Sequence, residues 1–139
     1  MKKYFLIIFI LFAIIACSKK EEKLELFSAE SFAYSMDKGW EMNASVRVKG
    51  FEQKESGKEF KAKLSYSVDL ETSDGKLVEG IDKGIVDKTQ NEQMMDLPIN
   101  SQLKLDSTYK TGTYKVTFIV KDEFTGQKSI LWSFFELNN

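Results

Sequence analysis

The chain contains no histidine, one cysteine and one proline among its 139 residues. Without histidine there is no Ser-His-Asp or Cys-His pair, and no imidazole can bind a metal ion. The single cysteine, Cys17, has no second cysteine to pair with, so the chain forms no internal disulfide. These absences exclude the commonest hydrolytic and zinc-binding sites, and they require the folded part to be stabilised by packing alone.

Basic residues are neither numerous nor rich in arginine. The chain has 20 basic and 21 acidic residues, a formal net charge of −1, and Arg47 is its only arginine. Proteins that bind nucleic acid usually concentrate positive charge, and arginine is their usual reader of phosphates and guanine. The sequence therefore predicts no nucleic-acid partner.

The longest apolar run lies at the start of the chain. Lys2 and Lys3 precede the uncharged stretch from Tyr4 to Ala16. These 13 residues are fewer than the roughly 20 that a membrane-spanning helix needs. The length suits the apolar region of a secretory signal, usually about 7–15 residues. The sequence predicts that residues 1–16 are a cleaved signal peptide.

The end of this run, Ile14-Ile15-Ala16-Cys17, resembles the lipobox of bacterial lipoproteins. The resemblance implies that a diacylglycerol is attached to the sulfur of Cys17 and that a peptidase cuts just before this residue. The new amino group can then carry a further acyl chain such as palmitate. Two or more acyl chains anchor a protein stably to a membrane. The alternatives are an ordinary signal peptide, with Cys17 incidental, and a retained anchor helix, which the charged residues from Lys19 onward disfavour.

The residues after Cys17 bear on where the protein is held. Ser18, rather than aspartate, follows the cysteine, which in Gram-negative lipoproteins resembles the outer-membrane signal. We expect a lipid-anchored protein of the cell membrane or outer membrane, with its domain facing the periplasm or the cell exterior. Residues 17–23 are expected to form a charged tether, and residues 24–139 are of a length typical of one domain.

Alternating apolar and polar residues dominate the rest of the chain and predict strands that are buried on one face only. The predicted strands cover residues 32–36, 41–49, 60–70, 77–86, 94–105, 113–120 and 129–137. Polar stretches at residues 53–58 and 87–93 are predicted as loops, and Pro98 suits an edge strand or a loop. The fold class is all-β, a single antiparallel β-sandwich of about seven strands.

The last predicted strand is apolar on both faces, since Ile130, Trp132 and Phe134 alternate with other apolar residues. It is therefore expected to be central in its sheet or covered by another element. Trp132 is assigned to the core together with Tyr66, Tyr114 and Phe118.

The segment from Gly112 to Leu137 resembles the end of bacterial immunoglobulin-like and fibronectin-type-III-like β-sandwich domains. The shared features are a glycine-x-tyrosine strand start, an aspartate-containing turn with Thr-Gly, and an aromatic last strand. The resemblance implies that Tyr114 forms a tyrosine corner, with its hydroxyl bonded to nearby backbone. The chain departs from the pattern at Thr111, where many relatives have proline, and in having no disulfide.

Three aromatic residues, Trp40, Phe51 and Phe124, lie in or beside predicted turns. Exposed aromatics are typical of protein interfaces and sugar sites, so these three are the candidate binding residues, although caps on the sandwich ends are the simpler interpretation. Carboxylates recur at several turns, but none has the spacing of a known calcium loop, and no pair suggests a glycosidase. No metal and no cofactor are predicted.

The sequence as a whole favours a non-catalytic interaction role in the cell envelope, in assembly, adhesion or as an accessory subunit. The expected partners are the membrane, reached through Cys17, and another envelope protein. The alternative is a lipoprotein that binds a small ligand or a glycan through loop aromatics. An enzyme is the third possibility.

Overall fold

A computed structural model describes residues 22–139, and they form eight strands and no helix. The strands are β1 (Glu25–Ser35), β2 (Trp40–Lys49), β3 (Lys54–Ser56), β4 (Glu59–Glu71), β5 (Leu77–Gln90), β6 (Leu97–Leu105), β7 (Gly112–Asp122) and β8 (Lys128–Leu137). No helix in this part of the chain has the length and apolar character needed to cross a membrane. The predicted all-β class is confirmed.

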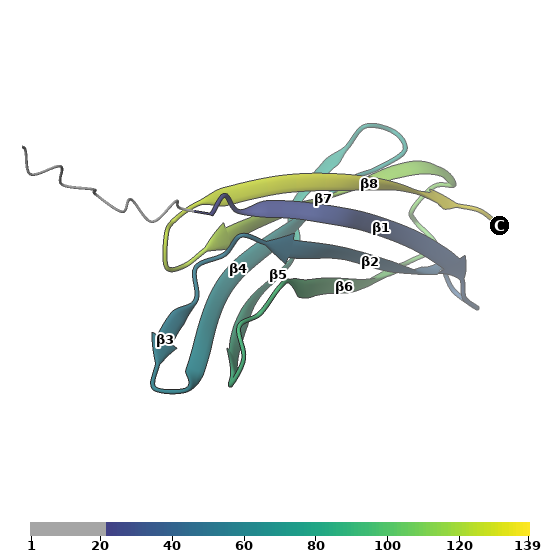
Figure 1. The fold of residues 1–139 in the computed structure, drawn as a ribbon. Helices are drawn as coiled ribbons and strands as arrows, with labels where there is room; N and C mark the ends of the chain where they lie inside the picture. The colour runs from purple at the N-terminus through teal and green to yellow at the C-terminus, as the bar shows by residue number, and fades with distance from the viewer. Residues whose placement is uncertain (1–21) are drawn as a thin grey trace, which may run out of the picture.

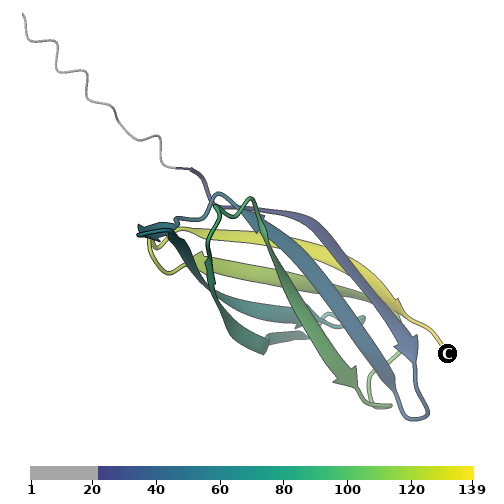
Figure 2. The ribbon, with the colours of Figure 1, turned by 60° about the horizontal axis from the view of Figure 1, so that its bottom comes forward.

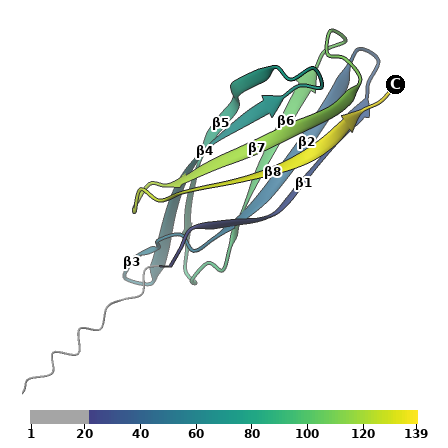
Figure 3. The same ribbon diagram turned by 90° about the horizontal axis from the view of Figure 1, so that it is seen from above.

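The strands form two antiparallel sheets that pack face to face. One sheet has the order β1-β2-β6, and it is the nearer layer in Figure 2. In the other sheet β4 pairs with β5 on one side and with β7 on the other, and β7 pairs with β8 (Figure 3). The short strand β3 pairs with the first residues of β4, beyond the end of β7. The predicted sandwich is therefore correct, with eight strands in place of about seven.

Apolar and polar residues alternate along β2, β4 and β7, and the apolar residues form the core, as the sequence predicted. One face of each strand is buried between the sheets, as expected when apolar residues recur at every second position. The core includes Met42, Ala44, Val46 and Val48 from β2, Ala62, Leu64, Val68 and Leu70 from β4, and Tyr114, Val116, Phe118 and Val120 from β7. Tyr66 is only partly buried, and its ring occupies the space that a side chain at Gly84 would fill.

The predicted tyrosine corner is present at the start of β7. The Tyr114 hydroxyl donates a hydrogen bond to the carbonyl oxygen of Lys110, at 2.6 Å, and the side chain is 1% exposed. Its ring stacks on Phe135 of β8, with 5.4 Å between ring centroids. The corner therefore fastens the β6–β7 loop to the core.

The prediction for β8 is wrong. This strand is at one end of its sheet rather than central, and its outer face is open to solvent. β8 lies alongside β1 of the other sheet (Figure 1), where the hydroxyls of Ser31 and Ser133 are 2.7 Å apart. The β1–β8 contact closes this side of the sandwich through side chains, and it leaves the outward residues of both strands uncovered.

Two predicted loops contain strands. Residues 53–58 include β3, and residues 87–90 continue β5 beyond its predicted end at Val86. Both segments are exposed and polar on each face, so periodicity gave no signal for them. Pro98 lies in β6, which is an edge strand, as expected for a residue without a backbone donor.

The described chain begins and ends at opposite ends of the sandwich (Figure 1). Leu24 is 2% exposed, and its backbone N–H donates to Oε1 of Gln127 in the β7–β8 turn, at 3.0 Å. The predictions for the signal peptide, for Cys17 and for most of the tether lie outside the described residues.

Candidate interaction surfaces

Trp40 is buried, which agrees with the simpler interpretation, a cap on one end of the sandwich, and not with an exposed binding residue. Only 8% of the residue is exposed, and its Nε1–H donates to the carbonyl oxygen of Asn138, at 2.8 Å. Although the turn at residues 37–39 comes directly before it, Trp40 is the first residue of β2 and pairs with Leu105 of β6. Its side chain therefore closes the end of the core at which the chain terminates.

Phe51 is also buried, with 4% of its surface exposed, so it too is a cap and not an exposed binding aromatic. Gly50 has a φ of +75°, a left-handed conformation that glycine adopts without strain, and a side chain there would collide with the carbonyl of Lys23. The chain thus turns sharply after β2, and the Phe51 ring caps the end of the core at which the described chain begins.

Phe124 is partly buried in the β7–β8 turn. Its backbone N–H donates to Oδ1 of Asp122, at 2.9 Å, and Lys54 Nζ lies 4.2 Å from the centroid of its ring. The three predicted binding aromatics do not meet at one site, because Trp40 and Phe51 lie at opposite ends of β2. Ten strand residues span about 33 Å.

The carboxylates noted in the sequence have structural partners. Asp122 is 1% exposed and accepts hydrogen bonds from the backbone of Glu52 and Phe124, and Asp69 accepts one from the backbone of Gly80. Asp82 accepts a hydrogen bond from Ser101 of the opposite sheet, at 2.6 Å. Within residues 22–139 no group of three or more carboxylate or cysteine side chains is placed to hold a metal ion.

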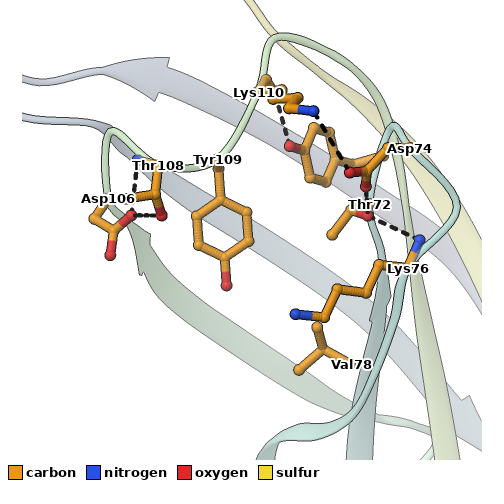
Figure 4. Close-up of a pocket in the computed structure, with 9 residues that line it drawn as sticks. Thr72, Asp74, Lys76, Val78, Asp106, Thr108, Tyr109 and Lys110 are labelled. Atoms are coloured by element: carbon orange, nitrogen blue, oxygen red, sulfur yellow. Dashed lines mark hydrogen bonds and ion pairs between the residues drawn. The ribbon is translucent and has the colours of Figure 1, made fainter.

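A polar cleft of about 320 Å³ lies between the β4–β5 turn and the β6–β7 loop, at the end opposite residue 22. Figure 4 shows Lys76 extending from one side of the cleft toward Tyr109 on the other. The Thr72 and Thr108 hydroxyls donate to Asp74 and to Asp106, which lowers the pKa of both carboxyls. These hydrogen bonds stabilise the two loops. They already engage four of the polar side chains that line the cleft.

Three large apolar side chains in a row are exposed on the outer face of β8. Ile130, Trp132 and Phe134 are 55%, 50% and 59% exposed on successive outward positions, and we name these three residues the β8 strip. Beside them on β7 lies Lys115, whose Nζ is 4.7 Å from the centroid of the Trp132 ring. An exposed antiparallel strand usually carries polar residues on its outer face, so the strip is unusual for a surface that is always in water.

The outer face of the other sheet has a different chemistry. Phe32 of β1, Asn43 of β2 and Gln102 of β6 lie in one row across the sheet, because Phe32 pairs with Asn43 and Asn43 pairs with Gln102. The next row in one direction holds Tyr34, Glu41 and Lys104, and the next row in the other direction holds Glu30, Ser45 and Asn100. We name these three rows the amide face.

Glu41 is the centre of a hydrogen-bond network on the amide face. Its Oε1 accepts hydrogen bonds from the Tyr34 hydroxyl and the Gln102 amide, and Nδ2 of Asn43 lies 3.5 Å away. These donors, Tyr34 first, lower the pKa of Glu41 despite its small exposed fraction of 9%. The bond to Glu41 raises the pKa of Tyr34 in turn. The network fixes the orientation of the side chains that surround it.

Sequence reasoning missed both surfaces. Phe32 and Tyr34 were read as part of a strand, but their face was not assigned, and Trp132 was placed in the core. The sequence of β8 did contain a signal, because both faces of this strand are apolar. Such a strand exposes one apolar face whenever it lies at the end of a sheet, as β8 does.

No protein-family model matches the chain, and no curated protein has a sequence that matches it.

Proposed function

We propose that the protein is a lipid-anchored lipoprotein of the bacterial cell envelope whose β-sandwich binds another envelope protein without catalysing a reaction. The anchor is Cys17, at the end of the lipobox-like Ile14-Ile15-Ala16-Cys17. The domain faces the periplasm or the cell exterior from the cell membrane or the outer membrane. Its role is in assembly or adhesion, or as an accessory subunit.

The β8 strip is the observation that supports this function most strongly. Three large apolar side chains lie in line on the outer face of a strand. Tryptophan is among the residues that contribute most to protein interfaces, and the rims of such interfaces are polar. Burying apolar surface contributes about 25 cal/mol per Å², so covering the strip with an apolar partner surface is favourable.

The type of sandwich is part of the proposal. We propose an immunoglobulin-like or fibronectin-type-III-like domain, supported by the Tyr114 corner and by the strand pairing. Strand β7 pairs with β4 on one side and with β8 on the other, and the order β4-β7-β8 matches the strand set C-F-G of immunoglobulin domains.

The loop-aromatic alternative is weakened by the burial of Trp40 and Phe51, which leaves Phe124 alone of the three. A catalytic function has less support, because Asp69, Asp82 and Asp122 are used in holding turns and sheets together.

A pull-down from native membranes tests the proposal with two matched variants. Ile130 and Ile85 are both outward-facing on the same sheet, 55% and 64% exposed, but Ile130 belongs to the β8 strip and Ile85 lies on the far strand β5. After chemical crosslinking, wild type and Ile85→Ser are expected to recover the same stoichiometric protein. Ile130→Ser is expected to recover at least about tenfold less, equivalent to 1.4 kcal/mol.

Equal recovery with all three proteins, or no stoichiometric partner with wild type, contradicts a docking role for the β8 strip. The anchor is tested separately by Cys17→Ala. This variant should lose its membrane association, and its retention in washed membranes would contradict lipidation at Cys17.

A further inference from the structure

The amide face has a composition that differs from an ordinary solvent-exposed sheet. Exposed strands are usually covered with lysine and glutamate, as on the outer face of β4 at Lys61 and Lys63. In the middle row of the amide face Asn43 lies beside Gln102, and in the row that starts at Glu30 Ser45 lies beside Asn100. The centre of this surface is thus uncharged, yet it is rich in hydrogen-bond donors and acceptors.

Two exposed aromatic rings border these amides. Phe32 is 60% exposed in the row of Asn43, and Tyr34 is 46% exposed in the row of Glu41. Aromatic rings combine an apolar face with little conformational entropy to lose, and the apolar C–H face of a sugar ring packs well against them. The arrangement therefore supplies a stacking surface directly beside polar groups.

The polar groups are held in place before any ligand binds. The Gln102 amide donates to Glu41, as the Tyr34 hydroxyl does, and Asn43 turns its amide nitrogen toward the same carboxylate oxygen. Because the nitrogens of both amides point toward Glu41, their carbonyl oxygens are left to accept hydrogen bonds from a ligand. Preorganised side chains lose less entropy on binding, which increases affinity.

The surface is also hollowed. A shallow depression of about 470 Å³ is lined by Phe32, Asn43, Asn100 and Gln102, among others. Neighbouring strands lie about 4.8 Å apart, and side chains two positions apart on a strand about 6.7 Å apart, so the three rows present several polar groups within the width of one or two sugar rings.

Charge narrows the class of ligand. The carboxylates of Glu30, which lines the depression, and of Glu41 accept hydrogen bonds and repel anions. Lys104 pairs with Glu41 across the strands and favours its charged form, and Arg47 at one end of the sheet is paired with Asp96. A ligand that donates hydrogen bonds, carries no negative charge and presents an apolar ring face fits these requirements. We infer that the amide face is a binding site for a neutral carbohydrate. This activity is separate from protein binding at the β8 strip.

Affinity electrophoresis of the full chain tests the inference. The protein is run in a polyoxyethylene detergent, whose head group contains no sugar, through gels that contain hydroxyethylcellulose, mannan, xylan or galactan. At least one of these neutral polysaccharides is expected to retard wild type. Asn43→Ala and Gln102→Ala should weaken the retardation at least tenfold, because each removes an oriented amide.

Two phenylalanines provide a matched control. Phe32 and Phe134 are 60% and 59% exposed, on the neighbouring strands β1 and β8, but only Phe32 belongs to the amide face. Phe32→Ala should abolish retardation, and Phe134→Ala should leave it unchanged. The inference is overturned by an absence of retardation in all four gels, by equal loss with both variants, or by stronger retardation in the polyanion polygalacturonate.

Discussion

The two tryptophans of this protein occupy opposite environments. Trp40 follows a turn and yet is 8% exposed, with its indole N–H bonded to the carbonyl of Asn138. Trp132 lies in the middle of a strongly apolar strand and yet is 50% exposed, with Lys115 over its ring. The sequence-based assignment of Trp132 to the core is wrong. For Trp40 the sequence left a binding residue and a cap both open, and the cap is correct. Burial here depends on which face of a strand meets the other sheet, and local hydrophobicity does not reveal it.

The reason can be traced along β8. Phe135 and Leu137 are inward because Phe135 pairs with Tyr114, whose side chain is in the core. This parity places Ser133 inward, where it bonds Ser31 at the junction with β1, and it places Trp132 outward. In the middle of β8 the inward residue is therefore a serine, and its two neighbours, Trp132 and Phe134, face outward, which a count of apolar residues does not indicate.

The largest effect that follows from this contrast is on stability. Trp40→Ala is expected to lower the free energy of unfolding by about 3–5 kcal/mol, because it leaves a cavity at the end of the core. Urea denaturation followed by far-UV circular dichroism measures the change. A loss below about 1 kcal/mol would show that the ring does not close the core.

The tyrosine corner gives an intermediate effect at the same end of the sandwich. Tyr114→Phe keeps the ring that stacks on Phe135 but removes the hydrogen bond to the Lys110 carbonyl. The expected loss in unfolding free energy is about 1–2 kcal/mol. The same denaturation experiment measures it, and an unchanged midpoint would contradict a stabilising role for the corner.

Trp132→Ala should have a small effect on stability, of less than about 1 kcal/mol, because it removes an exposed ring and one cation–π contact. Fluorescence sharpens the contrast with Trp40. Acrylamide should quench the emission of Trp40→Phe, which retains Trp132, more strongly than that of Trp132→Phe, which retains Trp40. Equal quenching of the two variants would contradict the difference in exposure.

The smallest expected effect concerns pH. Hydrogen bonds from Tyr34 and Gln102 lower the pKa of Glu41 from its ordinary value of 4.5, and Lys104 favours the same charged form. The resulting stabilisation is complete above that value and is lost as pH falls through the lowered pKa. Asp74, Asp106 and Glu123 have lowered pKa values as well, so Glu41→Gln is the necessary comparison. Wild type should lose more stability on acidification than this variant, and parallel curves would contradict the proposed network.

The sequence predicted the fold well wherever one face of a strand is apolar and the other polar. The strands β2, β4 and β7 satisfy that condition, and their buried residues were identified correctly except for Tyr66, which is only partly buried. The strand β3 and the end of β5 are polar on both faces, so their sequences show no strand pattern. They are strands only because they pair with β4. The tyrosine corner could be predicted because it depends on a short local motif.

The candidate surfaces could not be assembled from the sequence. The amide face combines residues from β1, β2 and β6, and the positions of Phe32 and Gln102 are 70 apart in the chain. Only the pairing of Asn43 with both of them places these residues in one row. For Trp40 and Phe51, the proximity of a turn left binding and capping both open. Both residues are caps, because a chain that turns at the end of a sandwich can fold an aromatic ring over the core.

Site-specific photo-crosslinking in living cells tests the central claim, that the β8 strip is a docking surface, most directly. A benzophenone side chain is placed at Trp132 in one strain and at Ile85, on the far strand of the same sheet, in another. The proposal predicts one discrete crosslinked protein from position 132 and none from position 85. The absence of a crosslinked protein at position 132, or the same products from both positions, would contradict it.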